Sequence, residues 1–311
     1  MSTASDSSQR RSRIRYAAVP VFLLMLFGVG APIVTDWTPR PMTSLYKAST
    51  TLVFGHRGAA ALAPENTLQA MKAAKKAGAH GVEFDVVLTR DKQIAVFHDL
   101  KLEKRLQDKK GSISSMTLAE LRKVDLTPYL AERRPDLKPM PAIYKQAKVP
   151  TLDELFAWYK KHPTVILNIE LKSRDVSDKG LEKAVWSLIQ KYGYEKRVLI
   201  SSFNPFALYR FRKLAPQILR GLIYGPKTPI YIRQRWFAWL AQPDALHPDH
   251  ILVDAAYMNW ARKKGFAVHP WTVNDRGKMQ RLKALGVGLL ITDYPNRAIE
   301  TLFPKAAPRS R

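Results

Sequence analysis

The sequence predicts an α/β fold in which eight parallel β-strands, each followed by an α-helix, close into a (β/α)8 barrel. Beyond residue 50, short runs rich in Val, Ile and Leu alternate with helical stretches. About eight such units fill roughly 250 residues, which is the usual size of this barrel. The rival fold, an open doubly wound sheet, places Gly-x-Gly-x-x-Gly after its first strand, and this sequence has none there.

Each strand and helix is predicted from a local pattern. The expected strands are short apolar runs at 51–55, 81–88, 164–171, 197–202, 218–224, 250–254, 266–272 and 288–292. Helical patterns such as 66–78, 180–193 and 275–286 each end on a glycine, as helix C-termini often do. Residues 132–150 hold four prolines and are expected to form a loop without regular structure. Residues 226–243 mix aromatic side chains with arginines, which suits either a lipid interface or a helix packed over the barrel.

The N-terminal part predicts a membrane-spanning segment. Residues 1–15 carry four arginines, and residues 16–34 contain no charge and are long enough to cross a bilayer. A basic flank ahead of the apolar run predicts a cytoplasmic N-terminus, with the rest of the chain on the extracytoplasmic side, periplasmic or extracellular. The alternative is a signal peptide that is cleaved, which would leave a secreted protein. The expected organisation is a basic segment 1–15, an anchor 16–34, a linker 35–49, a barrel domain 50–303 and a basic tail 304–311.

Composition limits the classes of function. The chain has no cysteine, which excludes disulfides, thiolate catalysis and cysteine-ligated metal centres. A formal net charge of +25 predicts an attraction to polyanions. We find no nucleic-acid-binding module, so anionic lipid or a phosphate-bearing substrate is the expected partner rather than nucleic acid.

Two carboxylates raise the central chemical question. Glu83 and Asp85 are two positions apart on a predicted strand, so both side chains point to the same face. They would repel each other unless they face water or hold a cation between them. Glu170, on the next barrel strand, would add a third acid. Further polar side chains follow the predicted strands at the end where a barrel places its active site: His56, Arg57, His98, Lys172 and Trp271.

A set of motifs then resembles a known family. The motifs are GHRG at 55–58, PENT at 64–67, EFDV at 83–86, HD at 98–99, PTLDE at 150–154, NIELK at 168–172, WTVN at 271–274 and TDYP at 292–295. In this order they resemble the glycerophosphodiester phosphodiesterase family, over about residues 50–303. The resemblance implies a TIM barrel, a divalent cation, Ca2+ or Mg2+, and hydrolysis of glycerophosphodiesters to glycerol 3-phosphate and an alcohol.

The resemblance also implies roles for single residues. Glu83, Asp85 and Glu170 match the family's metal ligands, and carboxylate oxygens suit a hard cation. His56 and His98 match the two histidines that act as general acid and base, in an attack by the neighbouring glycerol hydroxyl that gives a cyclic phosphate.

Three further residues are expected to bind substrate. Arg57 and Lys172 would hold the phosphate oxygens, which adds positive charge where the transition state is negative. Trp271 would stack on the glycerol or its head group. Two of the three have an alternative reading, as an exposed loop residue for Arg57 and as a core residue for Trp271.

Three hypotheses for function follow. The first is a glycerophosphodiesterase that acts on deacylated phospholipids. The second is a lysophospholipase D, for which a membrane anchor and a basic, aromatic surface would be useful. The third is a barrel without catalysis that binds lipid or a cell-wall polymer, which the complete set of histidines and acids argues against. Charge alone would also allow DNA binding, which predicts salt-sensitive association with duplex DNA.

Overall fold

The computed structural model describes residues 37–47, 51–102, 111–124, 131, 141–173, 177 and 180–304. The predicted basic segment 1–15 and the predicted anchor 16–34 lie outside these residues. None of the helices in the described part of the chain combines the length and the apolar character that a bilayer span requires.

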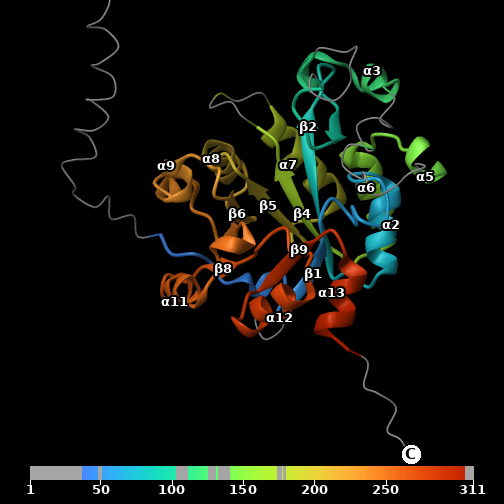
Figure 1. Ribbon diagram of the computed structural model, residues 1–311. Coiled ribbons are helices and arrows are strands. Elements are labelled where there is room, and N and C mark those ends of the chain that lie inside the picture. Colours follow the sequence, from blue (N-terminus) through green and yellow to red (C-terminus); the bar gives the residue numbers. More distant parts are fainter. Residues whose placement is uncertain are drawn as a thin grey trace, which may run out of the picture. The chain divides into compact units, whose positions relative to one another are not determined.

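Eight parallel strands form a nearly closed barrel with the helices around it (Figure 1). The strands are β1 (Leu52–Gly55), β2 (Gly81–Leu88), β4 (Ile166–Leu171), β5 (Val198–Ser202), β6 (Leu219–Tyr224), β7 (Ala245–Pro248), β8 (Ala267–Val268) and β9 (Leu289–Thr292). Their order is β8-β7-β6-β5-β4-β2-β1-β9. A ninth strand, β3 (Ile94–Val96), pairs antiparallel with the outer half of β2.

The two ends of this order meet and close the barrel. The amide of Gly288 donates to the carbonyl of Val268 at 3.1 Å, and the amide of Ile291 donates to Pro270 at 3.0 Å. The amide of Val273 donates back to Ile291 at 2.9 Å. Closure brings the first and the last strands side by side, in the register Gly55 to Thr292, so residues from both ends of the chain share one rim.

The helices cover the outer face of the strands. They are α2 (Leu68–Lys76), α3 (Leu118–Arg122), α5 (Ala142–Lys145), α6 (Leu152–Tyr159), α7 (Leu181–Tyr192), α8 (Pro205–Leu214), α9 (Ile230–Arg233), α10 (Ala238–Ala241), α11 (Ala255–Lys263), α12 (Arg276–Ala284) and α13 (Pro295–Leu302). The described residues also form three short 3-10 helices, η1 (Met42–Ser44), η2 (Ile113–Ser115) and η3 (His250–Leu252).

Local sequence explains where these helices begin and end. The Thr151 hydroxyl accepts from the amide of Glu154, whose carboxylate accepts from the Thr151 amide, and this capping box starts α6. Asn204 caps α8 ahead of a proline in the first turn. At the C-terminal end of α7, Gly193 has φ +64°, a backbone conformation that is unfavourable for a residue with a side chain.

The inside of the barrel is apolar at the end where the strands begin. Its buried side chains come from β1, β5, β6, β7 and β9, together with two from the segment before β1: Met42, Tyr46, Leu52, Phe54, Leu199, Leu219, Ala245, Leu289 and Ile291. The segment 37–47, which the sequence suggested was linker, therefore contributes to the core. Arg40 fastens it through an ion pair of 2.8 Å with the buried carboxylate of Asp244.

The structure confirms seven of the eight predicted strand positions and corrects the other. The prediction of a strand at 250–254 is wrong, because Asp249 accepts a hydrogen bond from the amide of Ile251 and starts the 3-10 helix η3 there. The strand of that unit is Ala245–Pro248, whose composition is less β-like. The prediction of no regular structure in 132–150 is also wrong in part, because residues 142–145 form α5.

Candidate active site

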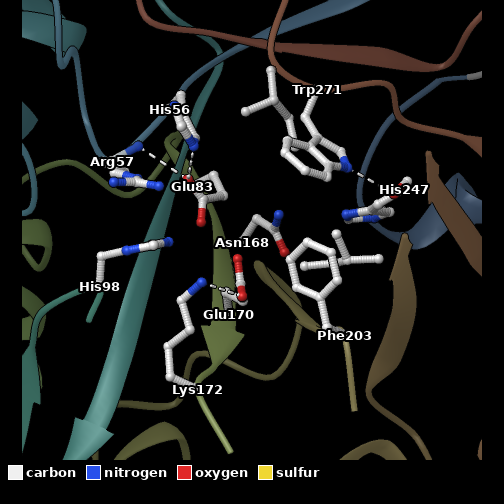
Figure 2. A pocket seen from close by; sticks show the side chains of 12 residues that line it. His56, Arg57, Glu83, His98, Asn168, Glu170, Lys172, Phe203, His247 and Trp271 are labelled. Atoms are coloured by element: carbon white, nitrogen blue, oxygen red, sulfur yellow. Dashed lines mark hydrogen bonds and ion pairs between the residues drawn. The ribbon is translucent and has the colours of Figure 1, made fainter. Parts of the chain in front are cut away.

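A cavity of about 110 Å³ lies at the carboxyl ends of the barrel strands (Figure 2). The residues that line it come from β2, β4, β6, β7, β9 and the segments that follow the strands: His56, Arg57, Glu83, His98, Asn168, Glu170, Lys172, Phe203, Ile223, His247, Trp271 and Ile291. All residues predicted for the site except Asp85 line this cavity. Asp85 forms ion pairs with two of the lining residues, Lys172 and Arg57.

Three acids meet at one point beside the cavity. Asp85 is the register partner of Glu170 on β4, and Glu83 lies two residues earlier on β2. One ligand atom from each carboxylate lies within 4.8 Å of the others, and all three residues are buried. The acids therefore do not face water, which removes the alternative of exposed strand carboxylates.

Burial and mutual repulsion perturb these acids. Burial, together with the charges of Asp85 and Glu170, raises the pKa of Glu83 well above its ordinary value. Burial also raises the pKa of Glu170 to about 7, in spite of the opposing charge of Lys172. Asp85 behaves differently: burial opposes its ionisation, but Lys172, His98, Arg57 and the hydrogen bond from Asn66 together outweigh burial, and its pKa falls well below the ordinary value.

Two cations lie among the acids. The Nζ atom of Lys172 is 2.5 Å from Oε1 of Glu170 and 3.0 Å from Oδ1 of Asp85. Arg57 donates from Nη1 to Glu65 at 2.8 Å, and its backbone amide donates to Oε2 of Glu83 at 3.0 Å. Arg57 is buried, so its reading as an exposed loop residue is wrong.

The loop after β1 is shaped to support this cluster. Arg57 and Asn66 both have positive φ, 50° and 57°, a conformation that is unfavourable for side chains other than Asn and Gly. The Asn66 amide group donates to Oδ2 of Asp85 at 2.7 Å, and its carbonyl oxygen accepts from the Asp85 backbone amide at 3.1 Å. This pair of hydrogen bonds fixes the position of one acid from a separate loop.

Each histidine is held by an aspartate. Nδ1 of His56 is 2.6 Å from Oδ1 of Asp293, and Asn274 donates to the other oxygen of Asp293 at 2.7 Å. Although burial opposes it, the bonded His56 lowers the pKa of Asp293 to about 2, so this carboxylate is ionised. An ionised carboxylate accepts the Nδ1 proton, and Nε2 of His56 then faces Glu83 at 3.9 Å.

His98 has the same kind of arrangement, and its ring points toward the acids (Figure 2). Its Nδ1 atom is 2.5 Å from Oδ1 of Asp99, the next residue in the chain. Burial lowers the pKa of His98 to about 4, so the ring is neutral near pH 7. Imidazole rings held in this way beside buried carboxylates can accept a proton from a bound substrate and, once protonated, give it back.

The remaining wall of the cavity is aromatic. Trp271 stands edge-on to Phe203, with ring centroids 5.5 Å apart, and its Nε1–H donates to the carbonyl of His247 at 2.9 Å. Trp271 is thus both part of the wall and packed against a neighbour.

Sequence reasoning missed several residues of this site. Phe203, Asn168 and His247 line the cavity, although they were not among the predicted site residues. Asn168 could have been found, because it is two positions before Glu170 and alternation puts both side chains inside the barrel. Phe203 lies just after β5 and carries no comparable sequence signal.

Comparison with known proteins gives a consistent result. The profile of the glycerophosphoryl diester phosphodiesterase family matches residues 56–297. A glycerophosphodiester phosphodiesterase of Caldanaerobacter subterraneus is 34% identical over 251 residues, 80% of this chain and 96% of the relative. A glycerophosphodiester phosphodiesterase of Bacillus subtilis is 30% identical over 301 residues, 92% of this chain and 97% of the relative.

Solved structures agree. A phosphodiesterase of Oleispira antarctica in complex with the product sn-glycerol-3-phosphate superposes with a TM-score of 0.64 at 28% identity, covering 81% of this chain and 96% of the other. A glycerophosphodiester phosphodiesterase of Thermotoga maritima gives a TM-score of 0.59 at 26% identity, covering 80% and 97%. Both superpositions cover at least 80% of this chain.

Proposed function

Because the chain belongs to the glycerophosphoryl diester phosphodiesterase family and is a phosphoric diester hydrolase, we propose that it releases glycerol 3-phosphate with a divalent cation and two histidines. The substrate class is the glycerophosphodiesters. The single observation that carries this proposal is the meeting of three buried acids beside two imidazoles that each contact an aspartate.

The acid cluster fits a hard cation. Glu83, Asp85 and Glu170 offer only oxygen atoms, which Ca2+ and Mg2+ prefer. The buried Oε1 atom of Glu83 has no hydrogen-bond partner among the described residues, and such an atom needs a positive neighbour. A bound cation would supply electrostatic stabilisation of the phosphate charge. The donor set does not distinguish between the two metals.

Arg57 and Lys172 would hold the phosphate. Arg57 is buried and Lys172 is largely buried beside the acids, and burial strengthens a charge-assisted hydrogen bond to a phosphate oxygen. Lys172 contacts two acids at once, so part of its charge is already compensated by the protein. Arg57 comes from the loop after β1 and would approach the phosphate from another side. Together they would keep the phosphorus between the histidines.

The two histidines would move the protons. In the first step one imidazole accepts the proton of the glycerol hydroxyl beside the ester while that oxygen bonds to phosphorus. The bond from phosphorus to the alcohol breaks, and the other imidazole, which enters the step protonated, gives its Nε2 proton to the leaving oxygen. Water then opens the cyclic phosphate, with the two roles exchanged. His56 and His98 are placed for this exchange because each keeps its Nδ1 bound to a carboxylate.

A turnover assay tests the proposal. Glycerol 3-phosphate release from glycerophosphocholine would be measured with added Ca2+ or Mg2+ and again with a chelator. We expect turnover that needs the cation and that falls by at least about 10³-fold in His56→Ala and in His98→Ala. His162→Ala is the control, because His162 is a partly exposed residue that does not line the cavity and packs on Trp158. Turnover that survives either catalytic substitution would contradict the proposal.

A second candidate function is lysophospholipase D activity. A mouse lysophospholipase D is 25% identical over 276 residues. The stretch 226–243 follows β6 at the same rim as the cavity and carries four exposed large apolar side chains: Ile230, Tyr231, Trp236 and Trp239, the two tryptophans 50% and 40% exposed. Aromatic and basic residues together suit the interface of an anionic membrane.

This second candidate has its own test. Binding to phosphatidylglycerol vesicles and choline release from lysophosphatidylcholine would be compared in the wild type and in a Trp236→Ser, Trp239→Ser double variant. Loss of both in the variant, with glycerophosphocholine turnover unchanged, would support it. Equal vesicle binding by the two proteins would remove the role of this rim.

We further propose that residues 16–34 anchor the chain and place the barrel outside the cytoplasm. The support is the sequence pattern of an apolar run behind four arginines. An alkaline phosphatase fusion at the C-terminus would be active in cells if this is correct, and inactive if the barrel stays in the cytoplasm.

A further inference from the structure

The floor of the cavity, by which we mean the part lined by Asn168 and His247, holds polar atoms that the reaction described above does not use. Both polar atoms of the Asn168 side chain, Oδ1 and Nδ2, are buried without a hydrogen-bond partner among the described residues. The same is true of Nδ1 of His247. Both residues line the cavity, on the side where Figure 2 shows Phe203 and Trp271. Buried polar atoms without partners are rare and costly, so a ligand that pairs with them would bind well here.

His247 stands at the end of a buried hydrogen-bonded chain. Its Nε2 atom is 2.9 Å from Nδ1 of His269, and Nε2 of His269 is 2.7 Å from the hydroxyl of Tyr46. All three side chains are buried. Tyr46 comes from the segment before β1, outside the residues 56–297 that the family profile matches. A residue of the N-terminal segment is thereby linked to the floor of the cavity.

Two glycines make room for this chain. A Cβ atom on Gly221 of β6 would lie 2.3 Å from Nε2 of His247. A Cβ atom on Gly288 would lie 2.4 Å from the Tyr46 hydroxyl. Both distances are far below van der Waals contact and involve packed groups, so neither position could carry a side chain while the linked groups stay in place.

In this hydrogen-bonded chain of side chains, each group can donate its proton to the next, from Tyr46 to His269 to His247. Among the described residues the Tyr46 hydroxyl meets only His269, so its proton must go to Nε2 of that ring to be bonded. His269 then carries its own proton on Nδ1 and donates it to Nε2 of His247. His247 in turn carries its proton on Nδ1. Burial lowers the pKa of His269 well below the ordinary value, so the ring stays neutral.

The charged groups and the neutral polar groups therefore line different parts of the cavity. The three acids, Arg57 and Lys172 lie on one side and suit a phosphate and a cation. Asn168 and His247 present only neutral donors and acceptors. A hydroxyl group, which both donates and accepts, matches such neutral groups better than a phosphate does.

We propose that Asn168 and His247 bind the terminal hydroxyl of the glycerol moiety, and that Tyr46, through His269, holds His247 in the donating tautomer. The inference rests on the proposed function for the identity of the substrate. It adds a subsite for the free end of glycerol and makes Tyr46 a positioning residue.

Two phosphates that differ in one hydroxyl test the subsite. sn-Glycerol 3-phosphate and the matching phosphate of propane-1,2-diol share the hydroxyl beside the ester, and only the first has the terminal hydroxyl. Their affinities for the full chain would be measured by calorimetry with Ca2+ present. We expect the wild type to bind the glycerol compound about 10- to 100-fold more tightly, the usual effect of one buried hydrogen-bonding group.

Single substitutions locate the preference. His247→Leu should reduce the ratio of the two affinities to near one, and Tyr46→Phe should reduce it several-fold although it removes only an oxygen far from the ligand. Tyr159→Phe is the matched control, because it removes a buried tyrosine hydroxyl that has no partner among the described residues and lies on α6 outside the cavity. The ratio of the two affinities in this control variant should equal that of the wild type.

The outcomes separate the two proposals. A wild type that binds both phosphates equally would overturn the subsite, and so would a ratio left unchanged by Tyr46→Phe and His247→Leu. If His247→Leu does not fold, the Tyr46→Phe ratio still decides. A normal ratio in a protein that does not hydrolyse glycerophosphocholine would support the subsite and would count against the proposed function alone.

Discussion

The Nδ1 atom of His56 lies 2.6 Å from Oδ1 of Asp293, although 237 positions separate the two residues in the chain. They meet because β1 pairs with β9 and each residue follows the end of its strand. Closing the barrel thus creates the pair that orients one of the two histidines. A shift of the register between these strands would separate them.

Replacement of Asp293 should impair catalysis through His56. In Asp293→Asn the Nδ1 proton loses its ionised acceptor, so the ring can adopt the other tautomer and turn its Nε2 away from proton transfer. We expect kcat for glycerophosphocholine to fall by about 10²- to 10⁴-fold with a smaller change in KM. Steady-state kinetics measures this. Asp153→Asn, which removes an exposed carboxylate paired with Lys191, should change neither value.

Glu83 should couple cation binding to stability. Its raised pKa means that the ionised form is disfavoured without a cation, so Glu83→Gln should leave the melting temperature in chelator unchanged or higher. With Ca2+ or Mg2+ at about 100 times its dissociation constant, the wild type should gain about 2.7 kcal/mol, and the variant much less. Thermal scans with and without the cation test this. An equal gain in both proteins would place the cation elsewhere.

The buried histidine pair should make the fold sensitive to acid. Burial lowers the pKa of His247 to about 3, against about 6.5 in the unfolded chain. The unfolded state therefore binds the extra proton first, and the stabilising effect of a neutral His247 is present above pH 6.5 and lost as the pH falls toward 3. The loss is about 1.4 kcal/mol per pH unit.

A variant isolates this effect from other titrating groups. Urea unfolding of the wild type and of His247→Gln would be compared at several values between pH 7.5 and pH 5. The stability advantage of the wild type should shrink as the pH falls, because the variant has no histidine to protonate there. A difference that is constant with pH would contradict a buried neutral His247.

Asp244 should be a key residue for stability at the other end of the barrel. Its buried carboxylate accepts from the side chain of Arg40 at 2.8 Å and from the backbone amide of Arg220 at 2.9 Å. Asp244→Ala should cost about 3 to 5 kcal/mol, because it leaves buried donors and the charge of Arg220 uncompensated. Arg40→Ala should cost less, since Arg40 is partly exposed. Chemical denaturation measures both, and the double variant should be non-additive.

Much of the barrel follows from local pattern. The strands at 81–88 and 288–292 were predictable because short runs of Val, Ile and Leu between helices are typical of buried strands. The strand Ala245–Pro248 was not, because its residues have weak strand propensity and its pairing with β6 decides its conformation. The neighbouring run at 250–254 has the better composition, but the cap supplied by Asp249 turns it into η3.

For the candidate site, too, the sequence predicts some features and not others. Alternation alone predicted that Glu83 and Asp85 share a face, and the order of the motifs implied the roles of His56 and His98. Alternation could not reveal that Lys172 reaches back to pair with Asp85, because that contact depends on the register of β2 and β4.

By itself, then, the sequence determined the strand–helix alternation, the acids that share one face of β2, and the family to which the chain belongs. Only the tertiary structure decided which distant groups meet: Asp293 with His56, and Tyr46 with His269 and His247. The physical reason is that periodicity is a property of neighbours along the chain. Contacts across a closed barrel depend instead on strand register and on the space that small residues leave.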